Sequence, residues 1–353
     1  MRRLLLAAAF CAAAAPVHAQ RSDSAAFIIR LGNDTTVVER YIRTPTQLIV
    51  EAVQRSPRTT VHRMVLDLTP TGLATRGTYT VQGATGGANL LDRQITGPAT
   101  GFLPVAGPFY STYELALMQA AKSRTAKTQL YMRTAQDSVA IPFERVGRDS
   151  LTLTNQFGEP MRAQIDAAGR LLHLHTPAFT TVERVKWVDL DALTREFANR
   201  DATGRGMGAL SPRFAARTRV GGANVWIDYS RPGTRGRPIW GALVPYGKVW
   251  RMGANDAAHF AVDKTVELGD LTLAPGTYTL FLLPNSATEW WLIVNRKTGI
   301  SGLDHDPAQD AGRVKLNVQA IERPAEAFTI DVQGNSLGVA WGNLRGSALI
   351  TVK

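Results

Sequence analysis

Short runs of β-branched and aromatic residues, separated by turn residues, constrain the fold of this 353-residue chain more than any other feature. In the first half they cover residues 27–31, 36–42, 47–53, 61–68, 77–81, 128–133, 138–145, 151–154, 161–165, 170–175 and 181–188. Apolar and polar residues alternate within many of these runs, which is the period of a strand with one buried face. The pattern predicts a mainly β chain that begins with an antiparallel meander.

One segment of this first half has the pattern of a helix. Ser111 and Glu114 have the spacing of a capping box, and an apolar run follows them. We expect a helix from residue 111 to about residue 123, packed inside a half-barrel that the meander forms. The stretch 83–109, rich in Gly, Ala, Thr and Pro, is expected to be a long loop or lid. A second, short helix is expected at 189–199.

A second set of strand runs, without helical periods, extends from residue 223 to residue 352. It predicts a separate β-sandwich or jelly-roll. The stretch 200–215 is expected to be a linker between an N-terminal β-rich domain at 20–199 and a C-terminal domain at 216–353. About 140 residues can bury an independent core, so we expect residues 211–353 to fold alone.

The first residues have the organisation of an export signal. Arg2 and Arg3 precede an apolar segment at 4–15 that is too short to cross a bilayer, and Ala19 ends a small-residue cleavage site. The only cysteine, Cys11, lies inside this signal, so a mature chain would have no disulfide and no Cys-based zinc site. We expect a periplasmic or secreted protein.

The formal net charge is +11, and the excess of basic residues is spread over both halves of the chain. Outside the cytoplasm such a surface would meet an envelope glycan, another anionic small molecule or polymer, or the surface and lipids of a membrane. Nucleic acid is not expected as a partner. The sequence does not specify the oligomeric state.

Residues 228–256 differ from the rest of the chain in composition. Arg and Lys are interleaved with aromatic residues, prolines and glycines, and acids occur only at the two ends. Pro and Gly at this density shape an ordered loop. Arg beside aromatic faces is suited to polar or anionic ligands, although the aromatic residues could also simply plug the sandwich. The predicted ligand-binding residues are Asp228, Tyr229, Arg231, Arg237, Trp240, Tyr246, Lys248, Trp250, Arg251, Asn255 and Asp256.

The same stretch carries a family resemblance. Its motifs are Asp228-Tyr229-Ser230-Arg231-Pro232, Gly236-Arg237-x-Ile239-Trp240-Gly241, Val244-Pro245-Tyr246-Gly247-Lys248-Val249-Trp250-Arg251 and Gly253-Ala254-Asn255. With them, residues 211–353 resemble the bacterial domain of unknown function 2911 (DUF 2911) family. In that family Glu commonly follows the Asn and Thr precedes the Gly, whereas this chain has Asp256 and Met252. The resemblance implies a secreted, mostly β domain and brings no established activity.

We interpret the loop as a non-catalytic binding surface for a polar, anionic or carbohydrate-like ligand, without a cofactor or a metal. Asp228 is expected to orient one of the loop arginines, Arg231, Arg237 or Arg251, through a salt bridge. Arg237 and Arg251 are both expected to contact the ligand and to contribute little to folding.

Two other functions fit the sequence. An envelope hydrolase would use Asp228, Asp256 and His259. A lipid carrier would hold its ligand in the N-terminal half-barrel, in a deep apolar cleft beneath the 83–109 loop.

Two further clusters contain residues that could bind metal. His173 and His175 share one face of a strand, but no third ligand is signalled near them. The acidic turn at 304–310 lacks the Gly and the Glu of a calcium loop. We expect both clusters to be solvated or packed.

Overall fold

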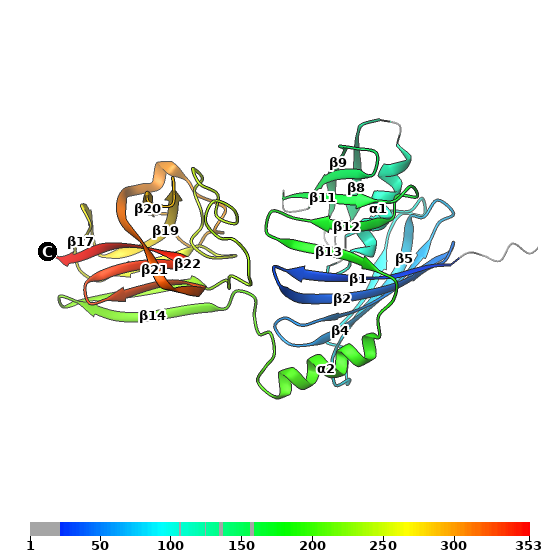
Figure 1. The fold of residues 1–353 in the computed structure, drawn as a ribbon, viewed down its shortest axis with the longest axis horizontal. Helices are drawn as coiled ribbons and strands as arrows, with labels where there is room; N and C mark the ends of the chain where they lie inside the picture. The colour runs from blue at the N-terminus through cyan, green and yellow to red at the C-terminus, as the bar shows by residue number, and fades with distance from the viewer. Residues whose placement is uncertain (1–21, 106, 124, 134–136, 156–158) are drawn as a thin grey trace, which may run out of the picture.

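The computed structural model describes residues 22–105, 107–123, 125–133, 137–155 and 159–353. The predicted export signal, with Cys11 and the cleavage site at Ala19, lies outside them. The described chain forms two β-rich lobes that lie side by side, joined through α2 (Leu190–Ala202) and the segment after it (Figure 1). The predicted mainly β fold is confirmed.

The N-terminal lobe contains one sheet of thirteen strands among the described residues. They are β1 (Asp23–Leu31), β2 (Asp34–Arg43), β3 (Gln47–Gln54), β4 (Thr60–Leu68), β5 (Ala74–Gly83), β6 (Leu91–Thr96), β7 (Leu103–Pro104), β8 (Lys127–Arg133), β9 (Ser138–Arg145), β10 (Ser150–Thr154), β11 (Pro160–Ile165), β12 (Leu171–His175) and β13 (Thr180–Val185). Their order, β6-β5-β4-β3-β2-β1-β13-β12-β11-β10-β9-β8-β7, makes two meanders that meet where β1 pairs with β13.

The antiparallel meander agrees with the prediction, since only the short pair β7 and β8 is parallel. Strands β6 and β7 lie in the stretch 83–109 that was expected to be a loop. The residues of β6 are mostly exposed and polar, so they lack the alternation that would reveal a strand. Pairing with β5 supplies the order that the local sequence does not.

Helix α1 (Ser111–Lys122) lies where the sequence predicted it, with Leu115 and Leu117 in the core of the lobe. The predicted capping box is wrong, because Tyr110 is the N-cap and no side chain of the helix caps it. The backbone N–H groups of Tyr110 and Ser111 instead donate to the buried carboxylate of Glu39, at 2.6 and 3.0 Å. A residue of β2 therefore caps this helix.

Glu114, the other half of the predicted capping box, fastens α1 to the sheet. Its side chain is fully buried. One carboxylate oxygen accepts from the Tyr41 hydroxyl (2.6 Å) and from Arg43 (3.2 Å). The other accepts from Arg184 (2.6 Å) and from the backbone N–H of Leu171 (2.9 Å).

Helix α2 covers the outside of the same sheet near the exit to the second lobe. Its Leu190 and Phe197 are buried against Val38 and Val53. The Asp189 side chain caps it by accepting from Ala192 N–H at 2.9 Å. The helix extends to Ala202, so its last residues fall within the predicted linker 200–215.

The C-terminal lobe contains the second sheet, in the order β14-β15-β16-β19-β20-β21-β22-β17-β18. Its strands are β14 (Arg213–Val220), β15 (Ala223–Ser230), β16 (Ala258–Val262), β17 (Val266–Leu268), β18 (Leu271–Leu273), β19 (Gly276–Pro284), β20 (Trp290–Asn295), β21 (Asp310–Gln333) and β22 (Ser336–Val352), with a 3-10 turn η1 (Pro307–Gln309) before β21.

This sheet folds over one core, as the sandwich prediction requires. The two long strands, β21 and β22, have breaks in their pairing around Ala320 and Ala325, and β15 contacts β21 although the two strands are not neighbours in the sheet. Strand β14 was not predicted. It is an exposed edge strand whose alternating Arg, Ala and Thr residues have little apolar signal, and it is held by pairing with β15.

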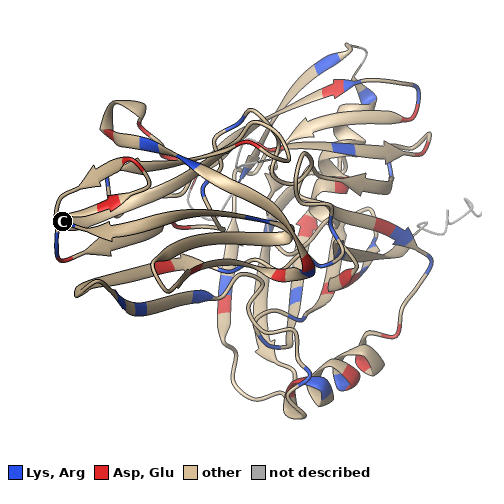
Figure 2. Ribbon diagram, turned by 60° about the vertical axis from the view of Figure 1, so that its left-hand side comes forward, with Lys and Arg blue, Asp and Glu red and all other residues tan. Residues whose placement is uncertain are grey.

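Charged residues of both signs are interspersed over the two lobes, with no single basic face in the view of Figure 2. Among the described residues, no helix has the length and the apolar character needed to cross a bilayer.

Candidate functional site

The loop between β15 and β16, residues 231–257, lies between the two lobes (Figure 1, yellow-green). Within the described chain, four non-glycine residues have a positive φ. Arg235 (51°), Met252 (48°) and Asn255 (61°) belong to this loop. Phe179 (62°) belongs to the turn between β12 and β13 of the N-terminal lobe, which contacts the loop through Ala178. Such conformations cost free energy and concentrate at functional sites, so the region has a specific, enforced shape.

The aromatic residues of the loop pack into the sandwich. The Trp240 ring lies 4.1 Å from the ring of buried Trp290, and its indole N–H donates to the Trp341 carbonyl at 2.8 Å. Tyr229, at the end of β15, is fully buried against Phe328. This part of the predicted site therefore plugs the core, as the structural alternative expected.

Trp250 has a double role. Its backbone bonds in both directions to Leu282 of β19, at 2.7 and 2.9 Å, which anchors the second half of the loop. Its ring stacks on the ring of Trp341 with centroids 5.5 Å apart. The side chain is half-buried, and both tryptophans line a pocket between the lobes.

The cations in the first half of the loop are occupied by protein acceptors. Arg231 lies over the Phe214 ring and donates to Phe328 and Thr329. Arg235 forms an ion pair with Asp34 of the N-terminal lobe. Arg237 has three carbonyl acceptors and, among the described residues, no carboxylate acceptor. Burial, followed by the charge of Arg235, lowers its pKa.

Arg251 differs from these cations. Its guanidinium forms no hydrogen bond and no ion pair with a described residue. The buried Nε of Arg235 also lacks a hydrogen-bond partner among the described residues, but that guanidinium is paired with Asp34. The stem of the side chain passes over Gly302, where an added Cβ would lie 2.6 Å from Arg251 Cδ. The side chain is therefore held in place by packing, and its guanidinium is not paired with a described residue.

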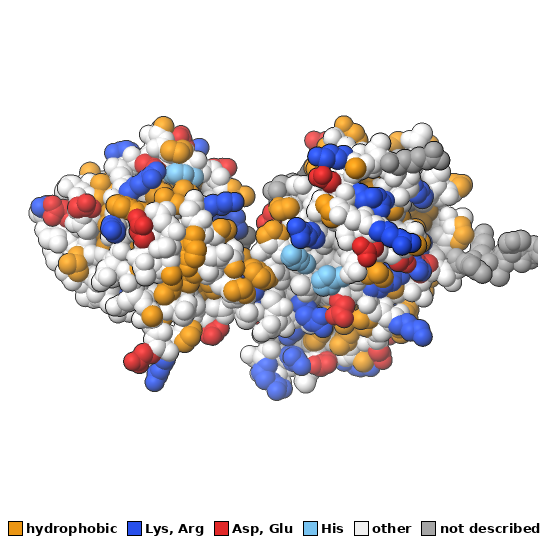
Figure 3. Space-filling model, turned by 45° about the horizontal axis from the view of Figure 1, so that its top comes forward, with side chains coloured by type: hydrophobic (Ala, Val, Ile, Leu, Met, Phe, Trp, Pro, Cys, Tyr) orange, Lys and Arg blue, Asp and Glu red, His pale blue; other side chains and the backbone are white. Residues whose placement is uncertain are grey.

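Arg251 faces a pocket of about 310 Å³ between the lobes. Figure 3 shows a furrow at this junction, with hydrophobic side chains gathered on the C-terminal lobe beside it. The lining residues come from both lobes and from the linker. They are Leu31, Glu159, Pro177, Ala178, Leu210, Ser211, Pro232, Arg237, Ala242, Leu243, Pro245, Trp250, Arg251, Gly253, Ala254 and Trp341.

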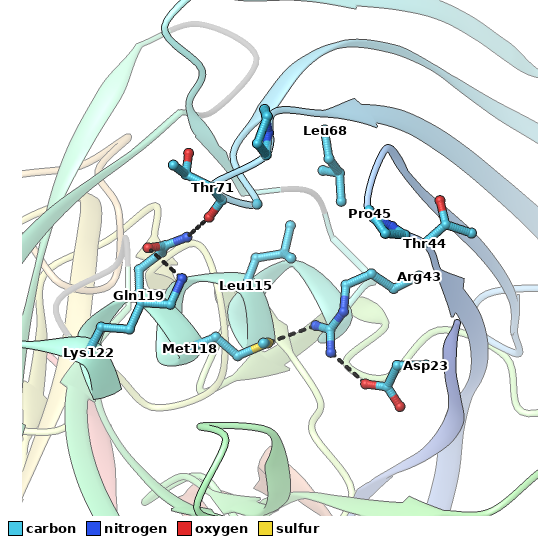
Figure 4. A pocket seen from close by; sticks show the side chains of 12 residues that line it. Asp23, Arg43, Thr44, Pro45, Leu68, Thr71, Leu115, Met118, Gln119 and Lys122 are labelled. Atoms are coloured by element: carbon cyan, nitrogen blue, oxygen red, sulfur yellow. Dashed lines mark hydrogen bonds and ion pairs between the residues drawn. The ribbon is translucent and has the colours of Figure 1, made fainter. Parts of the chain in front are cut away.

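A second pocket, of about 320 Å³, lies beside α1 in the N-terminal lobe (Figure 4). Its central cation, Arg43, is already neutralised, because it pairs with Asp23 at 2.5 Å and with Glu114 at 3.2 Å. Gln119 is likewise bonded to the Thr71 carbonyl at 2.6 Å. The polar groups of this pocket are mostly used within the protein, which separates it from the pocket at Arg251.

The remaining predicted residues lie outside the pocket at Arg251. Tyr246 and Lys248 are exposed at the tip of the loop. Asn255 and Asp256 are also exposed. The Asn255 carbonyl accepts from Gly302 N–H at 3.0 Å, and Asp256 forms an isolated bridge with Ser301. The structure thus gathers Arg237, Trp250 and Arg251 at the pocket and leaves these four elsewhere.

The predicted salt bridge from Asp228 to a loop arginine is wrong. Asp228 is held in a two-pronged contact by Arg213 of β14, with Nε and Nη2 at 2.6 and 2.8 Å from its oxygens. Pairing of β14 with β15 brings Arg213 opposite the end of β15, next to Asp228. The partner was missed because β14 itself was missed.

The geometry also disfavours the three residues proposed for a hydrolase, Asp228, Asp256 and His259. His259 Nδ1 lies 3.9 Å from Asp228 Oδ2, while Arg213 Nη2 approaches the same ring nitrogen at 3.3 Å. Burial, followed by the charge of Arg213, lowers the pKa of His259. Neither these residues nor Asp256 line the pocket between the lobes.

The lipid-carrier alternative needs a deep apolar cleft next to the 83–109 stretch. The pocket found there has a volume of about 300 Å³ and mixes apolar side chains such as Phe102 and Val105 with Arg93 and Arg133. The core beside it is packed with residues of α1. This pocket is partly polar, whereas the carrier alternative predicts a deep apolar cleft.

The two clusters that could bind metal are solvated or packed in the structure. His173 and His175 are exposed on β12. In the acidic turn at 304–310, His305 Nε2 lies 2.9 Å from Asp310, which also accepts from Asn295 at 2.8 Å. Within the described ranges, no group of three or more His, Cys, Asp or Glu side chains is placed to hold a metal ion.

Comparison with known proteins gives one match. Residues 211–350 match the family described as protein of unknown function (DUF2911). The resemblance inferred from the loop motifs is thus confirmed for the C-terminal lobe. No curated protein and no solved structure matches the chain. The DUF2911 region contains Arg251, Trp250 and Trp341, whereas the N-terminal wall of the pocket, with Leu31, Pro177 and Ala178, lies outside it.

Proposed function

We propose that the pocket between the lobes binds a small molecule with an anionic group, which the guanidinium of Arg251 holds. The observation that carries this proposal is the guanidinium of Arg251 at the pocket wall, which forms no hydrogen bond or ion pair with a described residue. Hydrogen bonds from a guanidinium to a carboxylate or a phosphate are about twice as strong as neutral ones, so an unpaired guanidinium at a pocket is suited to hold such a group. Arg237, by contrast, already donates hydrogen bonds to three carbonyl groups of the protein.

The rest of the wall favours a ligand that also has an apolar face. Trp250 and Trp341 line the pocket beside Arg251. Indole rings next to a guanidinium suit a sugar acid or a sugar phosphate, whose ring can pack on the aromatic surface while its anionic group meets the cation. The pocket volume of about 310 Å³ is near the lower limit for a small-molecule site.

Binding without chemistry fits the pocket better than hydrolysis. Glycoside hydrolysis commonly needs two carboxylates across the scissile bond. Among the described lining residues only Glu159 carries a carboxylate, and it accepts a hydrogen bond from Asn155 at 3.2 Å. Together with the export signal predicted at residues 1–19, this favours a periplasmic or secreted protein that binds an anionic glycan component of the envelope.

The proposal is tested by titrating the full mature chain with D-glucuronate, glucose 1-phosphate and glucose, with tryptophan fluorescence as the readout. We expect both anionic sugars, or one of them, to bind and neutral glucose to bind much more weakly. Arg251→Ala should weaken binding about ten- to a hundredfold. Arg251→Lys should restore only part of it, because Lys lacks the planar fork.

Arg323→Ala is the matched control, because Arg323 is an exposed arginine of the same lobe, on β21. If Arg251→Ala and Arg323→Ala weaken binding equally, the contribution is one of general charge and the pocket is not the site. Equal affinity for glucuronate and glucose would also contradict the proposal.

A further inference from the structure

The N-terminal lobe contacts the 231–257 loop through the turn between β1 and β2, residues 32–34. Asn33 N–H donates to the Arg235 carbonyl at 2.9 Å, and Asp34 forms the ion pair with Arg235. Arg237 Nη1 donates to the Ala178 carbonyl at 3.3 Å. We call the set formed by residues 32–34 and 235–237 the interlobe clasp.

At two glycines of the clasp, the two turns approach so closely that a side chain would not fit between them. A Cβ added to Gly32 would lie 2.1 Å from the Arg235 carbonyl oxygen, and a Cβ added to Gly236 would lie 2.1 Å from Asn33 Nδ2. Each turn is thus seated against the backbone or a short side chain of the other. Both glycines also have a positive φ, of 59° and 72°, which L-residues rarely adopt.

The clasp and the pocket share a wall. Arg237 belongs to both, and its acceptor Ala178 lines the pocket together with Leu31, the residue that precedes the clasp turn. Arg251 and Trp250, which also line the pocket, belong to the C-terminal lobe. If the lobes separated, the C-terminal lobe would keep Arg251 and lose the surface that closes the pocket over it.

We infer that the pocket is a composite site, complete only while the clasp is closed, so that the anionic ligand binds the docked lobes and holds them together. This inference rests on the proposed function and extends it from a site to a coupling between lobes. A ligand that binds only the docked arrangement stabilises that arrangement by its binding free energy. By linkage, opening the clasp must weaken binding by the same factor.

A matched pair of glycines in one loop allows the clasp to be tested in the full mature chain. Gly236 and Gly247 both have a φ of 72°, but an added Cβ meets Asn33 at Gly236 and nothing within 4 Å at Gly247. Gly236→Ala and Gly247→Ala therefore share the backbone cost, and only the first opens the clasp. We expect small-angle X-ray scattering to show a larger radius of gyration for Gly236→Ala than for Gly247→Ala and the wild type.

The second readout is D-glucuronate binding, followed by tryptophan fluorescence. Gly236→Ala should bind at least about tenfold more weakly than Gly247→Ala. Equal scattering of the two variants would overturn the clasp. Separated lobes with unchanged glucuronate affinity would overturn the composite site and leave the proposed function intact.

If the wild type binds neither glucuronate nor glucose 1-phosphate, the proposed function fails for these anions and the ligand coupling fails with it. Scattering still decides whether the clasp joins the lobes.

Asp34→Ala supplies a second variant in case Gly236→Ala does not fold. It removes the ion pair with Arg235 and leaves the C-terminal lobe unaltered. Asp92→Ala is its control, since Asp92 is an exposed carboxylate of the same lobe outside the clasp. Asp34→Ala should show the same direction of change in scattering and binding as Gly236→Ala, and a result equal to Asp92→Ala in both readouts would overturn the inference.

Discussion

The two lobes differ in the partners that surround a charged side chain in their interior. In the N-terminal lobe, Glu114 has two arginines, a tyrosine hydroxyl and a backbone N–H around it, so the cluster beside α1 is closed. In the C-terminal lobe, Arg251 is packed in place with its Nε unpartnered among the described residues. A closed cluster contributes to folding, whereas an open one leaves interaction free energy available for a ligand.

The largest expected effect is the loss of Glu114. Glu114→Ala leaves Arg43 and Arg184 partly buried without their carboxylate, although Asp23 remains near both. Breaking a buried pair in this way costs about 3–5 kcal/mol. Urea unfolding of the variant measures this loss in the free energy of unfolding.

Glu144→Ala is the control for that measurement, because Glu144 is half exposed and only 3.5 Å from Lys127 on the surface. It should change stability little. If both variants lose the same free energy, the Glu114 cluster does not fasten α1, and the contrast between the lobes disappears.

The Glu114 cluster shows why the sequence predicts helices and strands better than it predicts the contacts of single side chains. Strand alternation and the apolar run after Ser111 are local, so the meander, the sandwich and α1 could be predicted. The capping-box interpretation of Glu114 was also local. It was wrong because Arg184, seventy residues away in the sequence, competes for the same carboxylate across the sheet.

The site was predicted in part for the same reason. Composition identified the stretch 228–256, with Trp250 and Arg251 in it, but could not separate residues that plug the core from residues that face the pocket. The sequence showed Gly32 and Asn33 only as a turn. Their contact with Arg235 joins positions about two hundred residues apart, and no local pattern encodes it.

The next largest effect separates two arginines that the sequence treated alike. Arg237→Ala removes a half-buried guanidinium with three carbonyl acceptors, and should cost about 2 kcal/mol of unfolding free energy. Arg251→Ala should change stability by no more than about 0.5 kcal/mol, because no described group loses a partner. Urea unfolding without ligand measures both, and a larger loss for Arg251→Ala would mean that its guanidinium belongs to the fold.

The last effect is a change with pH rather than a loss at one pH. It concerns Glu39, the carboxylate counterpart of Arg251, which is fully buried and accepts from the backbone N–H groups of Tyr110 and Ser111. Burial raises its pKa from 4.5 to about 7, against the opposing effect of those hydrogen bonds. Between these two values the folded protein keeps a proton on Glu39 that the unfolded chain has released. The contribution to stability is therefore complete below about pH 4.5 and is lost as the pH rises through about 7, by up to about 1.4 kcal/mol per pH unit.

Glu39→Gln removes this titration and keeps one of the two acceptor oxygens; the hydrogen bond lost at the other oxygen costs the same at every pH and cancels in the pH dependence. The difference in unfolding free energy between variant and wild type should move in favour of the variant as the pH rises from about 5 to about 8, because the wild type alone must then bury a charge. Other titrating groups are the same in both proteins and cancel in the difference. A difference that stays constant over this range would mean that Glu39 is ionised in the folded protein throughout. The cap of α1 would then be a stable buried anion, and both lobes would hold a buried charge without a counter-ion.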